Sequence, residues 1–125
     1  MSLFGEELNG VQLERFHEYL TNNDVDFYEL LFIAVSCDQF DAAKIILNSG
    51  FEINSDIKRL GAELFICSQY DYSKHYVDLY LANGLTITPE LLTEINLIAQ
   101  ENSNHFEIER TYQFIAELSG LISTN

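Results

Sequence analysis

Basic residues are scarce in this chain: 6 Lys and Arg stand against 20 Asp and Glu, which gives the 125 residues a formal net charge of −14. Phosphate backbones are bound by Lys and Arg side chains, so this balance argues against a nucleic-acid partner. Anionic membrane surfaces are disfavoured for the same reason. The charge favours a basic protein partner, because a negative field speeds encounter with it. The alternative is that acidity serves only solubility.

Long hydrophobic runs are missing as well. No stretch approaches the ~18 apolar residues that a bilayer-spanning helix needs, and the first residues lack the basic and apolar regions of a secretory signal, so we expect a cytoplasmic protein. Cysteine occurs twice, without metal-type spacing. We expect Cys37 and Cys67 to be buried reduced thiols. Proline occurs once, which suits a compact helical array.

Catalytic motifs are also absent from the sequence. It contains neither a Gly-rich phosphate loop nor a Gly-x-Ser-x-Gly elbow. Glu14 and His17 have the Glu-x-x-His spacing of di-iron bundles, but no second copy exists. The histidines at 17, 75 and 105 are expected at the surface or at helix ends. We therefore expect no enzymatic activity, no metal and no cofactor. A small enzyme with a cryptic acidic site is an alternative, and it would need a polar pocket containing carboxylates of raised pKa.

The residues that are present form a series of helix patterns. Apolar positions at helical spacing predict seven helices and no strand. The expected ranges are 8–20, 27–36, 40–48, 57–70, 73–82, 89–101 and 105–118. Thr88 followed by Pro89 is the clearest helix start. Asp38 is expected to cap another helix, and Asn104 with Glu107 resembles a capping box.

A 33-residue period runs through these helices. The triplet Leu31-Phe32-Ile33 returns as Leu64-Phe65-Ile66 and then as Leu97-Ile98-Ala99, and the three stretches close on Gly50, Gly84 and Gly120. Asn48-Ser49-Gly50 also has the composition of a left-handed helix end. A fixed period of this size is typical of stacked helical repeats, which provide extended binding surfaces.

One copy of this period has a familiar pattern. Residues 31–54, LFIAVSCDQFDAAKIILNSGFEIN, resemble an ankyrin repeat. The resemblance rests on Ala34-Val35 at the end of the first helix, Ile45-Ile46-Leu47 before Gly50, and the closing pair Ile53-Asn54. Residues 64–88 and 97–120 match the pattern more weakly. The family's Thr-Pro-Leu-His tetrad is replaced by Glu29-Leu30-Leu31-Phe32, so apolar packing would have to hold the repeats together.

The resemblance implies an all-α fold in a single domain, 1–125. The expected architecture is a short α-solenoid of about three ankyrin-like helix-turn-helix repeats with an N-terminal capping helix. The cap would cover 6–26 and the repeats about 27–56, 57–88 and 89–120. A helical bundle, or another kind of α-solenoid, is the alternative.

Candidate partner-binding residues are aromatic or acidic. Tyr72, Tyr76 and Tyr80 recur at every fourth position and so lie on one stripe of a helix, where tyrosine combines a large contact area with a hydroxyl. In the alternative interpretation Tyr76 and Tyr80 pack between repeats. Phe51 falls at an expected projecting turn, where it either contacts a partner or packs on the next turn. The full candidate set is Tyr72, Tyr76, Phe51, Glu52, Asp38, Asp71, Glu63 and Glu29.

These features together indicate a non-enzymatic protein-binding module. The preferred hypothesis is an acidic inhibitor, a monomer that forms a heterodimer with a basic partner and neutralises it. In charge and size such a protein is similar to bacterial immunity proteins that block nuclease toxins, whose active clefts are basic. The alternative is an ankyrin-type scaffold or adaptor, in which apolar contacts would bind the partner.

Overall fold

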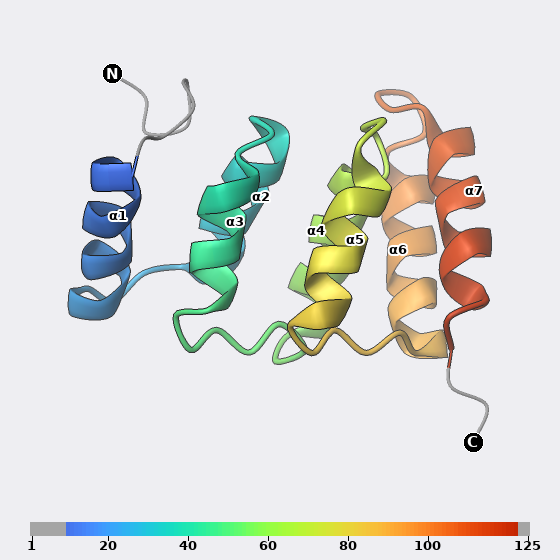
Figure 1. Ribbon diagram of the computed structural model, residues 1–125. Helices are drawn as coiled ribbons and strands as arrows, with labels where there is room; N and C mark the ends of the chain where they lie inside the picture. Colours follow the sequence, from blue (N-terminus) through green and yellow to red (C-terminus); the bar gives the residue numbers. More distant parts are fainter. Residues whose placement is uncertain (1–9, 123–125) are drawn as a thin grey trace.

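The protein is described by a computed structural model that covers residues 10–122, and these residues form seven α-helices and no strand (Figure 1). The helices are α1 (Gly10–Asn22), α2 (Phe27–Ser36), α3 (Phe40–Leu47), α4 (Ile57–Cys67), α5 (Ser73–Ala82), α6 (Pro89–Glu101) and α7 (Ile108–Ser119). The all-α class expected from the sequence is confirmed for this part of the chain. None of the described helices combines the length and apolar character that crossing a membrane requires.

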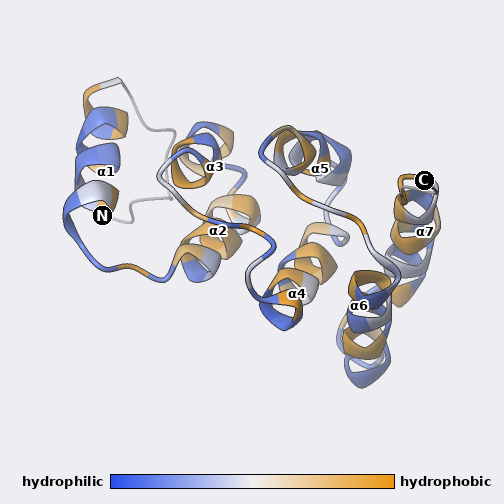
Figure 2. Ribbon diagram, turned by 90° about the horizontal axis from the view of Figure 1, so that it is seen from below, coloured by the Kyte–Doolittle hydropathy of each residue, from blue (hydrophilic) through white to orange (hydrophobic). Residues whose placement is uncertain are grey.

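The helices are arranged in two rows (Figure 2). In one row α2 packs on α4 and α4 packs on α6. In the other row α1 packs on α3 and α3 contacts α5, while α7 packs on α6 at the far end. Helices α1 and α7 therefore lie at opposite ends of the molecule (Figure 1).

The core is formed by apolar side chains from all seven helices, which make one continuous cluster. Its largest fully buried members include Tyr76, Tyr80, Leu31, Ile46, Leu64 and Ile95. Gly61 allows a close approach of α4 to α6, because a Cβ added there would lie 3.0 Å from the Cβ of Glu94 on α6. Apolar packing between adjacent helices thus holds the rows together.

The 33-residue period is only partly reproduced in three dimensions. Leu31 and Leu64 are both fully buried, but Leu97 is 46% exposed. On α6 the buried positions are Ile95 and Ala99, four residues apart. The third copy is therefore out of register with the first two, because the 3.6-residue turn of α6 decides which side chains face the core.

Several predicted helix ends are confirmed. The side chain of Thr88 accepts a hydrogen bond from the Leu91 amide, and Pro89 begins α6. Gly50 and Gly84 have φ of +86° and +99°, the left-handed conformation that glycine adopts without strain. The ranges expected for α2, α5 and α6 agree with the structure. The expected first helix begins at residues that lie outside the described part of the chain.

Other expectations about helix ends and cysteines are wrong. Gln39, not Asp38, precedes α3, and Asp38 lies in the turn with φ of +51°. Helix α7 begins only at Ile108, so the proposed capping box of Asn104 does not form. Cys67 is buried as expected, but Cys37 is exposed because it follows the last turn of α2.

Candidate protein-binding surface

The exposed or partly exposed candidate residues predicted from the sequence are divided between two opposite edges of the molecule, whereas Tyr76 and Glu63 are buried (Figure 1). The turns after α2, α4 and α6 lie at one edge, which we call the turn edge (residues 37–39, 68–72 and 102–107). The connections after α3 and α5 lie at the other, which we call the link edge (residues 48–56 and 83–88). Asp38, Asp71 and Tyr72 belong to the turn edge, and Phe51 and Glu52 to the link edge. No single surface unites them.

Tyrosines at every fourth position connect the turn edge to the core. The rings of Tyr72, Tyr76 and Tyr80 follow one another with centroid separations of 5.3 and 6.4 Å. Tyr72 is partly exposed, whereas Tyr76 and Tyr80 are fully buried. The alternative interpretation, packing between helices, therefore holds for the two deeper tyrosines. This corrects the expectation that Tyr76 offers contact area to a partner.

Each hydroxyl of this stripe is held by a different segment. Tyr72 donates to the carbonyl oxygen of Val35. Tyr76 donates to Oδ1 of Asp38 at 3.0 Å, which fixes the Asp38 side chain at the turn edge. Burial raises the pKa of Tyr76 well above its usual range, and the hydrogen bond to Asp38 raises it further, so the hydroxyl remains a donor.

Glu63 is not at the surface either, which corrects a second candidate. Glu63 is only 3% exposed, and the hydroxyl of Tyr80 donates to its Oε1 at 2.8 Å. The other oxygen, Oε2, has no hydrogen-bond partner. Burial raises the pKa of Glu63 to about 8, although the bond from Tyr80 opposes this shift. At neutral pH the side chain is therefore uncharged and adds nothing to an acidic surface.

Aromatic rings outside the set predicted from the sequence also lie at or beside the turn edge. Tyr70 stacks on Tyr72 with centroids 5.0 Å apart. Phe40 stacks on the exposed His75 at 3.9 Å and meets Tyr76 edge to face. We call Phe40, Tyr70, Tyr72 and His75 the aromatic cluster. Its members come from α3, the turn after α4, and α5, so no local sequence pattern could have assembled it.

Two carboxylates lie beside the aromatic cluster. Asp38 is exposed and forms no ion pair, whereas Asp71 accepts a 2.9 Å bond from Nη1 of Arg110. The same guanidinium contacts Glu107 at 2.8 Å. Among residues 10–122 only Asp26, Asp71 and Glu107 form ion pairs, and all three use Arg59 or Arg110. Most of the acidic charge is thus left without an internal counterion.

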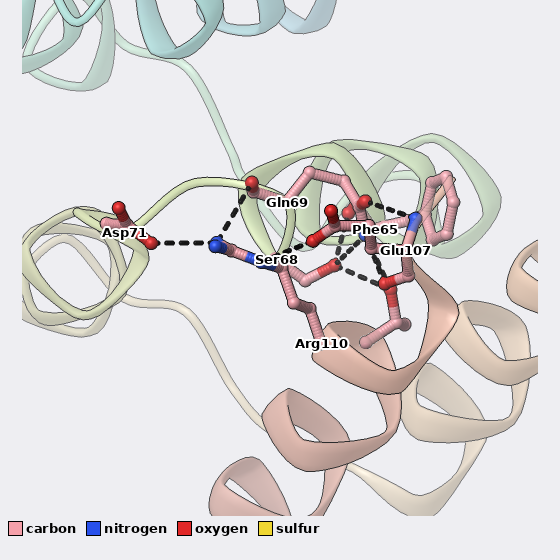
Figure 3. Close-up of polar contacts among 7 residues, drawn as sticks. Phe65, Ser68, Gln69, Asp71, Glu107 and Arg110 are labelled. Carbon is pink, nitrogen blue, oxygen red and sulfur yellow. Dashed lines mark hydrogen bonds and ion pairs between the residues drawn. The ribbon is translucent and has the colours of Figure 1, made fainter. Parts of the chain in front are cut away.

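A polar network fixes the turn edge between α4 and α7 (Figure 3). The hydroxyls of Ser68 and Thr111 are 2.8 Å apart and buried. The Gln69 side chain accepts from the amide of Glu107 at 3.0 Å and donates to its carbonyl oxygen and to Thr111 Oγ1. These bonds, together with Arg110, hold Asp71 in a defined position.

The link edge is built differently. Phe51 is half-buried, stacks on Phe27 at 5.4 Å and meets Tyr28 edge to face at 4.7 Å, so it packs against the start of α2 and not on the next turn. Asn54 joins the two connections by donating to the Gly84 carbonyl and accepting from the Thr86 amide. Glu52 is exposed beside Phe51, and Glu29 is exposed on the first turn of α2.

Comparisons of this chain with protein-family models, with curated proteins and with solved structures found no match. Within the described residues, no three His, Cys, Asp or Glu side chains are grouped so that they could hold a metal ion. At the turn edge, the exposed carboxylates of Asp38 and Asp71 lie together with the aromatic cluster.

Proposed function

We propose that this protein is a non-enzymatic binding module that uses its turn edge to bind a basic partner protein and neutralise it. An immunity protein that blocks a nuclease toxin is an example of such an inhibitor. The observation that supports this most directly is that the exposed carboxylates Asp38 and Asp71 lie on the same edge as the aromatic cluster, in a chain with a net charge of −14.

The proposed binding has a long-range and a short-range part. The unpaired carboxylates attract a basic surface and speed association. At contact, Tyr70 and Tyr72 can stack on arginine side chains, and Asp38 can accept their hydrogen bonds. Because Tyr76 already holds Asp38 and Arg110 already holds Asp71, little side-chain freedom is lost on binding.

We also propose that the helix pairs α2–α3, α4–α5 and α6–α7 are ankyrin-like repeats of a short α-solenoid, with α1 as the N-terminal cap. Three features support this: the serial packing of α2, α4 and α6, the left-handed glycines Gly50 and Gly84 after the second helices, and the Asn54 bridge between the two links. The third pair, α6–α7, departs most from the 33-residue pattern, because Leu97 on α6 is exposed where Leu31 and Leu64 are buried.

The proposed function can be tested by neutralising the two carboxylates at the turn edge. The partner is first captured from native lysate on the intact chain, and its charge is determined. The double variant Asp38→Asn with Asp71→Asn is then compared with Glu14→Gln with Glu18→Gln, which removes the same charge from the exposed face of α1. Surface plasmon resonance measures both rate constants at several salt concentrations.

We expect the turn-edge variant to lose about tenfold or more in affinity, mainly through faster dissociation, and the α1 variant to change only the association rate. Association of the wild type should slow steeply as salt is added. Equal effects of the two variants would contradict a role for the turn edge. A salt-independent association rate would favour the scaffold or adaptor alternative, in which acidity serves solubility only.

A further inference from the structure

A groove runs between α5 and α7, in the direction of these two helices. Two hollows of about 340 and 330 Å³ adjoin there and share Ser73, Phe114 and Glu117 as lining residues. The first is lined by Tyr70 and Asp71, so the groove opens at the turn edge. The second continues towards the opposite end of both helices. The groove therefore begins beside the aromatic cluster.

The floor of the groove is apolar away from the turn edge. Val77, Phe114 and Leu118 are buried beneath it, and Leu81 lines its side. Leu121 follows α7, lines the end of the groove away from the turn edge, and is 51% exposed. Helix α7 packs on α6, whereas α5 contacts α3. The apolar side chains between α5 and α7 are thus covered on the inner side only.

The two rims of the groove are acidic. Asp78 on α5 and Glu117 on α7 are exposed on opposite sides, and neither forms an ion pair within the described residues. Two cations line the groove among residues 10–122: Arg110 is already bound by Asp71 and Glu107, and Lys74 forms no ion pair with a described residue. An occupant with an apolar face and basic flanks would match this distribution.

We propose that the groove binds an amphipathic helix of the partner, with its apolar face on Leu81 and Leu121 and with Lys or Arg side chains against Asp78 and Glu117. This inference rests on the proposed function, because it specifies the segment by which the basic partner is bound. The stretch from Ser73 to Leu81 extends about 12 Å at the helical rise per residue, which accommodates about two turns of such a helix.

The groove can be probed without knowing the partner. The probe is a synthetic peptide of about four helical turns, with leucine at i, i+3, i+4 and i+7 and lysine elsewhere. It is titrated into the isotope-labelled intact chain and followed by amide chemical shifts. We expect the largest shifts in α5 and α7, and no binding of the matched peptide in which glutamate replaces lysine.

Matched variants separate this groove from general attraction to an acidic protein. Leu121→Ser should weaken peptide binding by about fivefold or more, and Asp78→Asn with Glu117→Gln should do the same. Leu97 on α6 is similarly exposed, at 46%, and lies outside the groove, so Leu97→Ser should leave the affinity unchanged. Shifts spread over all acidic surfaces, or equal affinities for the Leu121 and Leu97 variants, would overturn the proposal. Neither result affects the Asp38 and Asp71 test, so the two proposals can fail separately.

Discussion

At the scale of single residues, the buried carboxyl of Glu63 is the most unusual feature of the molecule. A carboxylate in an apolar core is costly unless it is fully hydrogen-bonded, and here only Oε1 has a partner, the hydroxyl of Tyr80. The raised pKa, about 8, means that the folded protein keeps a proton which the unfolded chain, with the ordinary glutamate value of 4.5, releases. Folding is thus linked to pH at this position.

We expect this linkage to appear when Glu63→Gln is compared with the wild type. The contribution of the neutral carboxyl is present below pH 4.5 and is lost as the pH rises towards about 8. The variant has no ionisable group at position 63, so its free energy of unfolding should match that of the wild type near pH 5 and exceed it by a few kcal/mol at about pH 9. Urea unfolding followed by circular dichroism measures these free energies at each pH. Parallel pH curves would contradict the prediction, and the exposed Glu52→Gln serves as the control.

At the scale of elements, α7 depends on a residue of another segment for its start. Glu107 stands at its N-cap position but makes no side-chain cap bond. The Gln69 side chain, from the turn after α4, accepts from the Glu107 amide and also donates to Thr111 Oγ1 within α7. The end of the α4 segment and the beginning of α7 are therefore coupled through one side chain.

Gln69→Ala should accordingly lower the free energy of unfolding by about 1–2 kcal/mol, because a helix-end amide and the Thr111 hydroxyl each lose a partner. Gln113→Ala, on the exposed side of α7, removes the same side chain from a position without such bonds and should change stability by less than about 0.5 kcal/mol. Denaturant unfolding measures the two variants. Equal losses would show that the Gln69 network does not stabilise α7.

At the scale of the whole molecule, we expect repulsion between carboxylates to exceed the attraction provided by the three ion pairs found among residues 10–122. The bridges of Arg59 and Arg110 are partly exposed, and pairs of this kind contribute about 0–1 kcal/mol each. The remaining acidic charge is crowded onto a small protein and opposes the compact state.

Salt should therefore stabilise the isolated protein. Between about 0.01 M and about 1 M sodium chloride the screening length falls roughly tenfold, and we expect the midpoint of thermal unfolding to rise by several degrees. Calorimetry of the wild type measures this effect. Glu14→Lys with Glu18→Lys, which reduces the net charge, should show a smaller rise. A midpoint that falls with salt would mean that the ion pairs outweigh the repulsion.

Local patterns were sufficient for much of the fold. The helix class, the start at Thr88 and the left-handed Gly50 follow from side chains and backbone preferences that act within a few residues. The candidate site was less predictable. Asp38, Asp71 and Tyr72 were selected from the sequence and lie on one edge, but Phe51 and Glu52 lie on the opposite edge and Tyr76 is buried.

The sequence by itself determined the acidic charge, the helical class and several helix ends, such as the start at Thr88 and the turn at Gly50, because the helix signals depend on residues that are close along the chain. Only the tertiary structure decided that Tyr76 and Glu63 are buried, that Phe40 and His75 stack, and that Gln69 meets Glu107. These contacts join residues about 17 to 38 positions apart. Their geometry depends on how whole helices pack, which no local pattern specifies.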